Sequence, residues 1–255
     1  MAVIALCSAS GSPGVTTTAV ALAWNWHRPV WLVDADPVGG SAILAGIFRG
    51  MREYEAGLVE LALSPLDTAD ALLDVGQPVE GTSVTFVPGP RSRAQVPSLE
   101  PMWGRLGDAL DDLDKGGQDV IVDAGRLGMR GSPEPLLALA DLTLVVTRAN
   151  LVALSAVRSW ASPLAERSPA WRDPGLLVVG AGRPYPSKEV AEFLGLPVVA
   201  SVHDDARAAG VYHSGLAPER KWATGTYARS VRGAADAITS RIARGRAELL
   251  EGVTS

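Results

Sequence analysis

Hydrophobic residues in this chain fall into two alternating kinds of segment. The first kind is short, rich in valine, isoleucine and leucine, and continuously apolar instead of alternating with polar positions. Continuous runs of this kind are typical of strands in a parallel sheet that is buried on both faces. The predicted strands lie at residues 3–7, 30–33, 84–87, 119–122, 142–147, 176–179 and 198–201.

Longer amphipathic stretches separate these runs and predict helices. The expected helices cover residues 16–26, 55–63, 99–113, 151–160, 188–194 and 225–250. An order of strand, helix and strand implies right-handed crossovers between parallel neighbours. The pattern therefore predicts a single α/β domain over residues 1–255, a doubly wound, mostly parallel sheet with helices on both faces. Ligands of such sheets bind beyond the carboxyl ends of the strands.

Composition narrows the class of protein. The chain has 255 residues and is 47% hydrophobic, enough for one large core. Its net charge of -5 disfavours nonspecific DNA as a partner, because such binding depends on neutralising phosphates. The single cysteine, Cys7, lies in an apolar run, which indicates a buried side chain and a reducing, cytoplasmic compartment. We identify no signal peptide and no run of ~20 apolar residues that would span a bilayer. The scattered histidines are interpreted as structural or surface residues: His27, His203 and His213.

A glycine-rich loop after the first strand is the main candidate for an anion site. Residues 10–17 read Ser-Gly-Ser-Pro-Gly-Val-Thr-Thr and open a predicted helix. Glycines allow backbone N–H groups to turn inward, and the start of a helix adds a favourable dipole. The expected phosphate-binding residues are Gly11, Ser12, Gly14, Val15, Thr16 and Thr17. The Thr16 hydroxyl is placed to bind Mg²⁺. The loop lacks the usual lysine, so a plain strand-to-helix turn explains it about as well when it is taken alone.

Two other predicted strands end in carboxylates. Asp34 and Asp36 follow the second strand, and Asp123 follows a later one. Because the carboxyl ends of parallel strands meet at one edge, these residues are expected near the loop. We predict that they hold Mg²⁺ together with Thr16, partly through water, and that Asp36 orients a water if any hydrolysis remains. Ordinary turn or capping carboxylates are the alternative, since Asp-Pro followed by Gly-Gly is common turn chemistry.

With these residues the chain resembles the ParA/MinD family, whose deviant Walker A loop reads Lys-Gly-Gly-x-Gly-Lys-Thr-Thr and is followed by Asp-x-Asp-Pro. The resemblance covers most of the chain. Ser10 stands in place of the signature lysine and Val15 in place of the Walker lysine. The matching positions are Gly11, Gly14, Thr16, Thr17, Asp34, Asp36, Pro37 and Asp123. The most similar subfamily is the CpaE/TadZ group of Flp pilus assembly, which often lacks the Walker lysine.

The resemblance implies a positioning or assembly factor, for Flp pilus or secretion machinery, that binds ATP or ADP with Mg²⁺ weakly or not at all. Efficient hydrolysis is not expected, because two charge-assisted contacts of roughly 1.5–3 kcal/mol each are absent. Two alternatives stay open. One is an active partitioning ATPase for chromosome, plasmid or division-site positioning, in which Arg126 or Arg130 compensates. The other is an interaction domain that binds no nucleotide.

The resemblance also implies a homodimer, protein partners in a larger assembly, and a cytoplasmic protein recruited to the membrane or cell pole. The family commonly has asparagine after the strand 176–179, where this chain has Gly180 and Gly182, so the sequence does not predict which base is bound. The C-terminal segment 238–250 is similar to the membrane-targeting tail of MinD. Gly245 interrupts it and Glu248 opposes anionic lipid, so a helix packed on the sheet is favoured over membrane contact.

Overall fold

The computed structural model describes residues 2–11, 13–52, 54–113, 117–165 and 171–253, and its strands form one sheet. The strand order is β3-β4-β2-β5-β1-β6-β7-β8. All neighbouring strands are parallel except β3 and β4, so the predicted mostly parallel sheet is confirmed. The strands are β1 Val3–Ser8, β2 Val30–Asp34, β3 Gln77–Pro78, β4 Val84–Val87, β5 Asp119–Arg126, β6 Leu142–Arg148, β7 Pro174–Val179 and β8 Val198–Val202.

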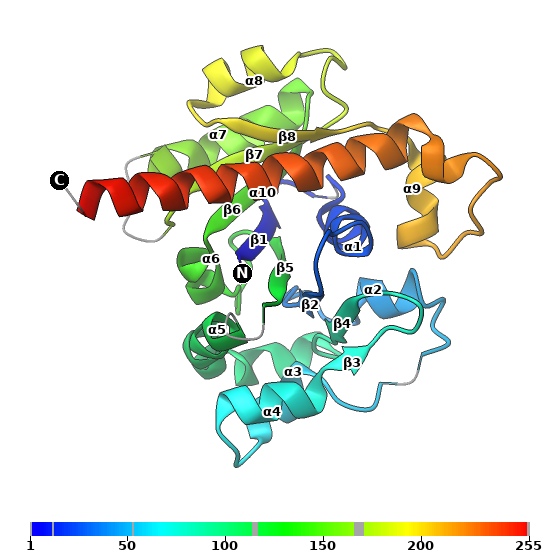
Figure 1. The fold of residues 1–255 in the computed structure, drawn as a ribbon, viewed down its shortest axis with the longest axis vertical. Coiled ribbons are helices and arrows are strands. Elements are labelled where there is room, and N and C mark those ends of the chain that lie inside the picture. Colours follow the sequence, from blue (N-terminus) through cyan, green and yellow to red (C-terminus); the bar gives the residue numbers. More distant parts are fainter. Residues whose placement is uncertain (1, 12, 53, 114–116, 166–170, 254–255) are drawn as a thin grey trace.

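Helices cover both faces of this sheet. On one face lie α1 Val15–Trp24, α2 Ala42–Ala45, α9 Ala206–His213 and α10 Thr226–Val253. On the other lie α3 Leu58–Leu63, α4 Thr68–Val75, α5 Trp103–Asp112, α6 Glu134–Leu139, α7 Leu151–Ala165 and α8 Ser187–Leu194. Figure 1 shows α3, α4 and α5 gathered at one end of the molecule and α10 running along the sheet.

Strand β1 shows why the apolar runs do not alternate. The side chains of Ile4 and Leu6 belong to the core beneath α1 and α10, whereas Ala5 and Cys7 belong to the core beneath the other helices. All four are fully buried, which confirms that the side chain of Cys7 is buried. Each face of the sheet therefore requires apolar residues, as expected for a two-sided parallel sheet.

Several helix boundaries differ from the prediction. The helix expected at 55–63 begins at Leu58, because Gly57 is its N-cap and donates its backbone N–H to Glu60 Oε2 at 2.9 Å. The segment expected at 99–113 begins as a short 3-10 turn, Glu100–Met102, before α5. The short helices α2, α4, α6 and α9 and the edge strand β3 were not predicted, because they have too few turns or residues for a clear periodicity.

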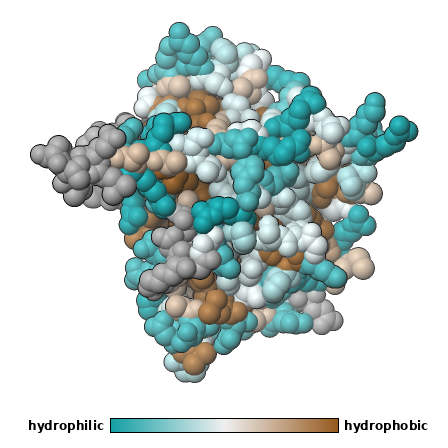
Figure 2. Space-filling model, in the orientation of Figure 1, coloured by the Kyte–Doolittle hydropathy of each residue, from teal (hydrophilic) through white to brown (hydrophobic). Residues whose placement is uncertain are grey.

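The C-terminal helix packs on the sheet, as favoured from the sequence. Tyr227, Val231, Ala235, Ile238 and Ile242 recur at helical spacing and are buried in the core beneath α1 and α10. The helix continues through the glycine that was expected to interrupt it. Figure 2 shows hydrophobic residues as separate small patches on the face over α10. In the described part of the chain, no helix has the length and apolar character needed to cross a membrane.

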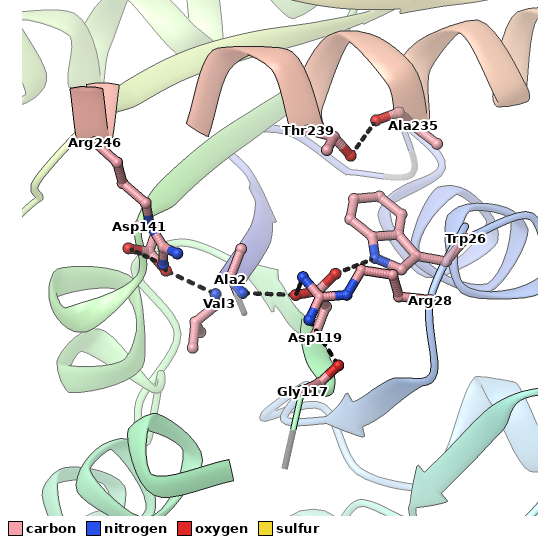
Figure 3. A network of polar contacts seen from close by, with 10 residues as sticks. All are labelled: Ala2, Val3, Trp26, Arg28, Gly117, Asp119, Asp141, Ala235, Thr239 and Arg246. Atoms are coloured by element: carbon pink, nitrogen blue, oxygen red, sulfur yellow. Dashed lines mark hydrogen bonds and ion pairs between the residues drawn. The ribbon is translucent and has the colours of Figure 1, made fainter. Parts of the chain in front are cut away.

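Two aspartates fix the amino ends of the central strands (Figure 3). Asp119, at the start of β5, accepts hydrogen bonds from the backbone N–H of Ala2 at 2.7 Å and from Trp26 Nε1 at 2.8 Å. Asp141, just before β6, accepts from the backbone N–H of Val3 at 2.9 Å and pairs with Arg246 of α10 at 3.1 Å. These contacts hold β1 in register with both neighbours. The carboxyl ends of β1, β5 and β6 consequently come together at the opposite edge.

Candidate functional site

A cavity of about 600 Å³ lies at the carboxyl ends of the strands. Five of the predicted phosphate-binding residues line it: Gly11, Gly14, Val15, Thr16 and Thr17. The sixth, Ser12, lies outside the described residues. The other lining residues that bear on the chemistry are Asp36, Arg126, Arg148, His203, Asp204, Asp205, His213 and Tyr227. The structure therefore brings the glycine loop and Asp36 together in one concave site.

The start of α1 presents backbone donors that have no partner among the described residues. Gly14 precedes the helix with φ 99° and ψ 33°, a left-handed conformation that favours glycine. The first hydrogen bond within the helix is donated by the Thr18 N–H to the Gly14 carbonyl at 2.8 Å. The N–H groups of Val15, Thr16 and Thr17 make no hydrogen bond to the described residues. A helix start with open N–H groups and no acidic residue in its first turn is suited to bind an anion.

Val15 leaves this anion site without a cation of its own. Its side chain is 6% exposed and packs into the core beneath α1 and α10. No lysine lines the cavity among the described residues, whereas two arginines do. Arg126 is the last residue of β5 and Arg148 the last of β6. Arg130, the other arginine considered from the sequence, does not line the cavity.

The three predicted carboxylates lie close together but face different surroundings. Asp34 and Asp123 are register partners on the adjacent strands β2 and β5. Burial raises the pKa of Asp123 to about 8, with repulsion from Asp34 and Asp36 adding to the effect. Burial also raises the pKa of Asp34 to about 6, although its hydrogen bond from Ser41 Oγ at 2.5 Å opposes the shift. Asp36 lines the cavity, and burial raises its pKa as well.

The site fits Mg²⁺ only if water and phosphate supply most of its ligands. The described residues contain no group of three or more His, Cys, Asp or Glu side chains arranged to hold a metal ion. Among the described residues Asp123 Oδ2 is nevertheless buried without a hydrogen-bond partner, and the nearby Thr16 hydroxyl lowers the pKa of this carboxyl. Thr16, Asp36 and Asp123 would hold a hydrated ion, which would balance phosphate charge. A metal-binding role for Asp34 stays a prediction, because its Oδ2 atom already accepts a hydrogen bond from Ser41.

The second wall of the cavity was not predicted as part of the site. It consists of the ends of β7 and β8, part of α9 and the start of α10, and it includes His203, Asp204 and His213. The two histidines were interpreted as structural or surface residues, and the structure places both at the cavity. Val179, Val202, Ala206, Ala209 and Tyr227 give this wall an apolar character. An apolar part of a ligand would be accommodated beside these residues.

Close approach of β5 to Asp36 requires glycine at position 125. Gly125 has a φ of +62°, and a Cβ there would lie 2.4 Å from Asp36 Oδ1. We expect Gly125→Ala to lower the melting temperature by at least twice as much as Gly195→Ala, which has a similar φ of +66° but open space around it. The Gly195 variant should lose roughly 2–4 °C, equivalent to about 1 kcal/mol of left-handed strain. Equal losses in thermal melts of the two variants would show that the Asp36 contact is not tight.

Comparison with known proteins supports the fold. No protein-family model and no curated protein sequence matches the chain. Among solved structures, MinD of Pyrococcus horikoshii OT3 complexed with Mg-ADP aligns with a TM-score of 0.71 and 18% identity over 93% of this chain and 95% of that chain. A ParA family ATPase from Chlorobium tepidum TLS aligns with a TM-score of 0.72 and 17% identity over 92% of this chain and 97% of that chain. The MinC:MinD cell division protein complex of Aquifex aeolicus aligns with a TM-score of 0.69 and 12% identity over 94% of this chain and 96% of that chain. The chain therefore has the P-loop α/β fold of ParA and MinD, as the resemblance implied.

Proposed function

We propose that this chain is a positioning or assembly factor that binds ATP or ADP with Mg²⁺ through the backbone of its glycine loop and has negligible ATP turnover. The observation that carries the proposal is the helix start at α1. Three backbone N–H groups open into a cavity of about 600 Å³, while the position of the Walker lysine holds the buried Val15. The first feature favours phosphate binding. The second removes the cation that would stabilise a transferring phosphoryl group.

The biological role follows from the fold by analogy. Structural relatives include a septum site-determining protein and a ParA family ATPase. We infer that this chain likewise positions a larger assembly, with a Flp pilus or secretion machine as the favoured version because of the missing Walker lysine. We expect a homodimer and a protein partner, and one relative is itself a complex of MinD with MinC. Recruitment to the membrane or cell pole would then depend on that partner.

The proposal is tested by measuring binding and turnover on the same protein. With saturating Mg-ATP we expect thermal stabilisation of the fold but phosphate release at the level of a blank without protein. Asp36→Ala should leave that background unchanged, because there is no turnover for Asp36 to assist. Phosphate release that is clearly above the blank and abolished by Asp36→Ala would contradict negligible turnover.

An active partitioning ATPase is the second candidate, and one observation favours it. Arg126 reaches the cavity from β5, so a cation is available near the loop without a lysine. Turnover sensitive to both Asp36→Ala and Arg126→Gln would support this candidate.

The third candidate is an interaction domain that binds no nucleotide. It requires that neither Mg-ATP nor Mg-ADP raises the melting temperature of the protein.

A further inference from the structure

Two arginines flank the glycine loop, one on each side of β1. Strand β1 lies between β5 and β6, and the loop follows directly from its carboxyl end. Arg126, the last residue of β5, is the register partner of Ser8, and the adjacent Leu127 donates its N–H to the Ser8 carbonyl at 2.8 Å. Arg148 ends β6 three residues after Val145, the register partner of Cys7. Both arginines line the cavity together with the loop.

These arginines are the permanent positive charges of the site. Of the described lining residues, the only other basic side chains are His203 and His213, while Asp36 and two further aspartates contribute negative charge. An arginine keeps its charge at every relevant pH, and its planar fork matches two oxygens of a phosphate. The loop that normally carries two lysines thus has two guanidinium groups beside it, supplied by the neighbouring strands.

Arg148 is restrained in the structure. Its Nη1 atom donates to Asp204 Oδ2 at 2.7 Å, and the two side chains are 40% and 31% exposed. Asp204 itself is held by a hydrogen bond from Arg183 Nη1 to its backbone carbonyl at 3.2 Å. Partly exposed ion pairs contribute little to stability, so a phosphate could displace the Asp204 carboxylate at small cost. Asp204 and a phosphate would therefore compete for the same guanidinium.

We infer that Arg126 and Arg148 bind the phosphate groups of the ligand in place of the two missing lysines, and that Asp204 restrains Arg148 until the ligand arrives. The inference rests on the proposed nucleotide binding and identifies the residues that supply its charge. It concerns the affinity for the ligand, not the rate of turnover.

The role of Arg126 is tested by titrating variants with Mg-ADP and with inorganic pyrophosphate. We expect Arg126→Gln to weaken both affinities at least tenfold and Arg126→Lys to recover part of the loss, since a lysine keeps the charge but not the fork. Arg130→Gln is the matched control, four residues along the chain and outside the cavity, and should bind as the unmodified protein does. Equal affinities for the Arg126 and Arg130 variants would overturn the inference.

The restraint of Arg148 by Asp204 is tested by a substitution that should strengthen binding instead of weakening it. Asp204→Asn should strengthen Mg-ADP binding severalfold, because it removes the competing carboxylate. The same substitution should have no effect in an Arg148→Gln background, which itself should bind more weakly. Weaker binding by Asp204→Asn, or the same gain without Arg148, would overturn this role. If the unmodified protein binds Mg-ADP and the arginine variants bind equally well, the arginine inference alone fails. If the unmodified protein does not bind, the proposed function fails with it.

Discussion

Replacing Val15 with lysine is expected to raise the affinity for Mg-ATP by roughly 10- to 100-fold, the equivalent of one charge-assisted hydrogen bond. Val15 opens α1, lines the cavity and is almost fully buried, so a lysine stem would occupy the space of the valine. Its ammonium group would extend into the cavity, beside the open N–H groups of the helix start. Calorimetric titration of both proteins with Mg-ATP measures the change.

Val15→Met is the control for this substitution. Methionine has a stem of similar length without a charge, so we expect no gain in affinity and a similar change in melting temperature. A comparable gain with methionine would show that packing, not charge, limits binding. An unchanged affinity in a folded Val15→Lys variant would show that the glycine loop is not arranged to bind phosphate.

Asp123→Asn is expected to raise the melting temperature at pH 9 by roughly 5–10 °C and to have a clearly smaller effect at pH 5. The pKa of Asp123 is raised from an ordinary value near 4 to about 8 by burial and by the neighbouring carboxylates. Because protonated Asp123 is favoured in the folded protein, its contribution to stability is fully present below the pKa of the unfolded chain, near 4. This contribution is lost as the pH rises through the pKa of the folded protein, about 8. Asparagine cannot ionise, so the variant should escape this loss.

Thermal melts between pH 5 and pH 9 in the absence of nucleotide test this expectation. The advantage of the asparagine variant should grow between pH 5 and about pH 8 and level off above that. Asp74→Asn is a suitable control, because Asp74 lies exposed on α4, and its melting curve should run parallel to that of the unmodified protein. A constant difference between the Asp123 variant and the unmodified protein at all pH values would contradict the raised pKa.

The continuous apolar runs predicted the fold well, because a parallel sheet with helices on both faces leaves little freedom in the type of its strand residues. Seven predicted strands are present, and β1 explains the pattern by burying Ile4 on one face and Ala5 on the other. Edge strand β3 and the short helices escaped prediction because a few residues cannot establish a period. The Asp67 side chain, which caps α4 by accepting from the Ala69 N–H, was an available signal.

The site could be predicted only on the side that carries a motif. Gly14, Thr16 and Asp36 belong to a loop and a strand end whose residue types suggest phosphate and magnesium, and they do line the cavity. Arg148 and His203 carry no such pattern. Their place at the cavity depends on which strands lie near β1, and the order β1-β6-β7-β8 is seen only in the structure.

Titration of the unmodified protein with Mg-ADP is the most direct test of phosphate binding by a loop without lysine. We expect one saturable site with a Kd between roughly 10 μM and 1 mM, or about -4 to -7 kcal/mol. Inorganic pyrophosphate should compete with Mg-ADP, and adenosine, which lacks phosphate, should not. If several millimolar Mg-ADP produced neither heat of binding nor thermal stabilisation, phosphate binding by this loop would be contradicted.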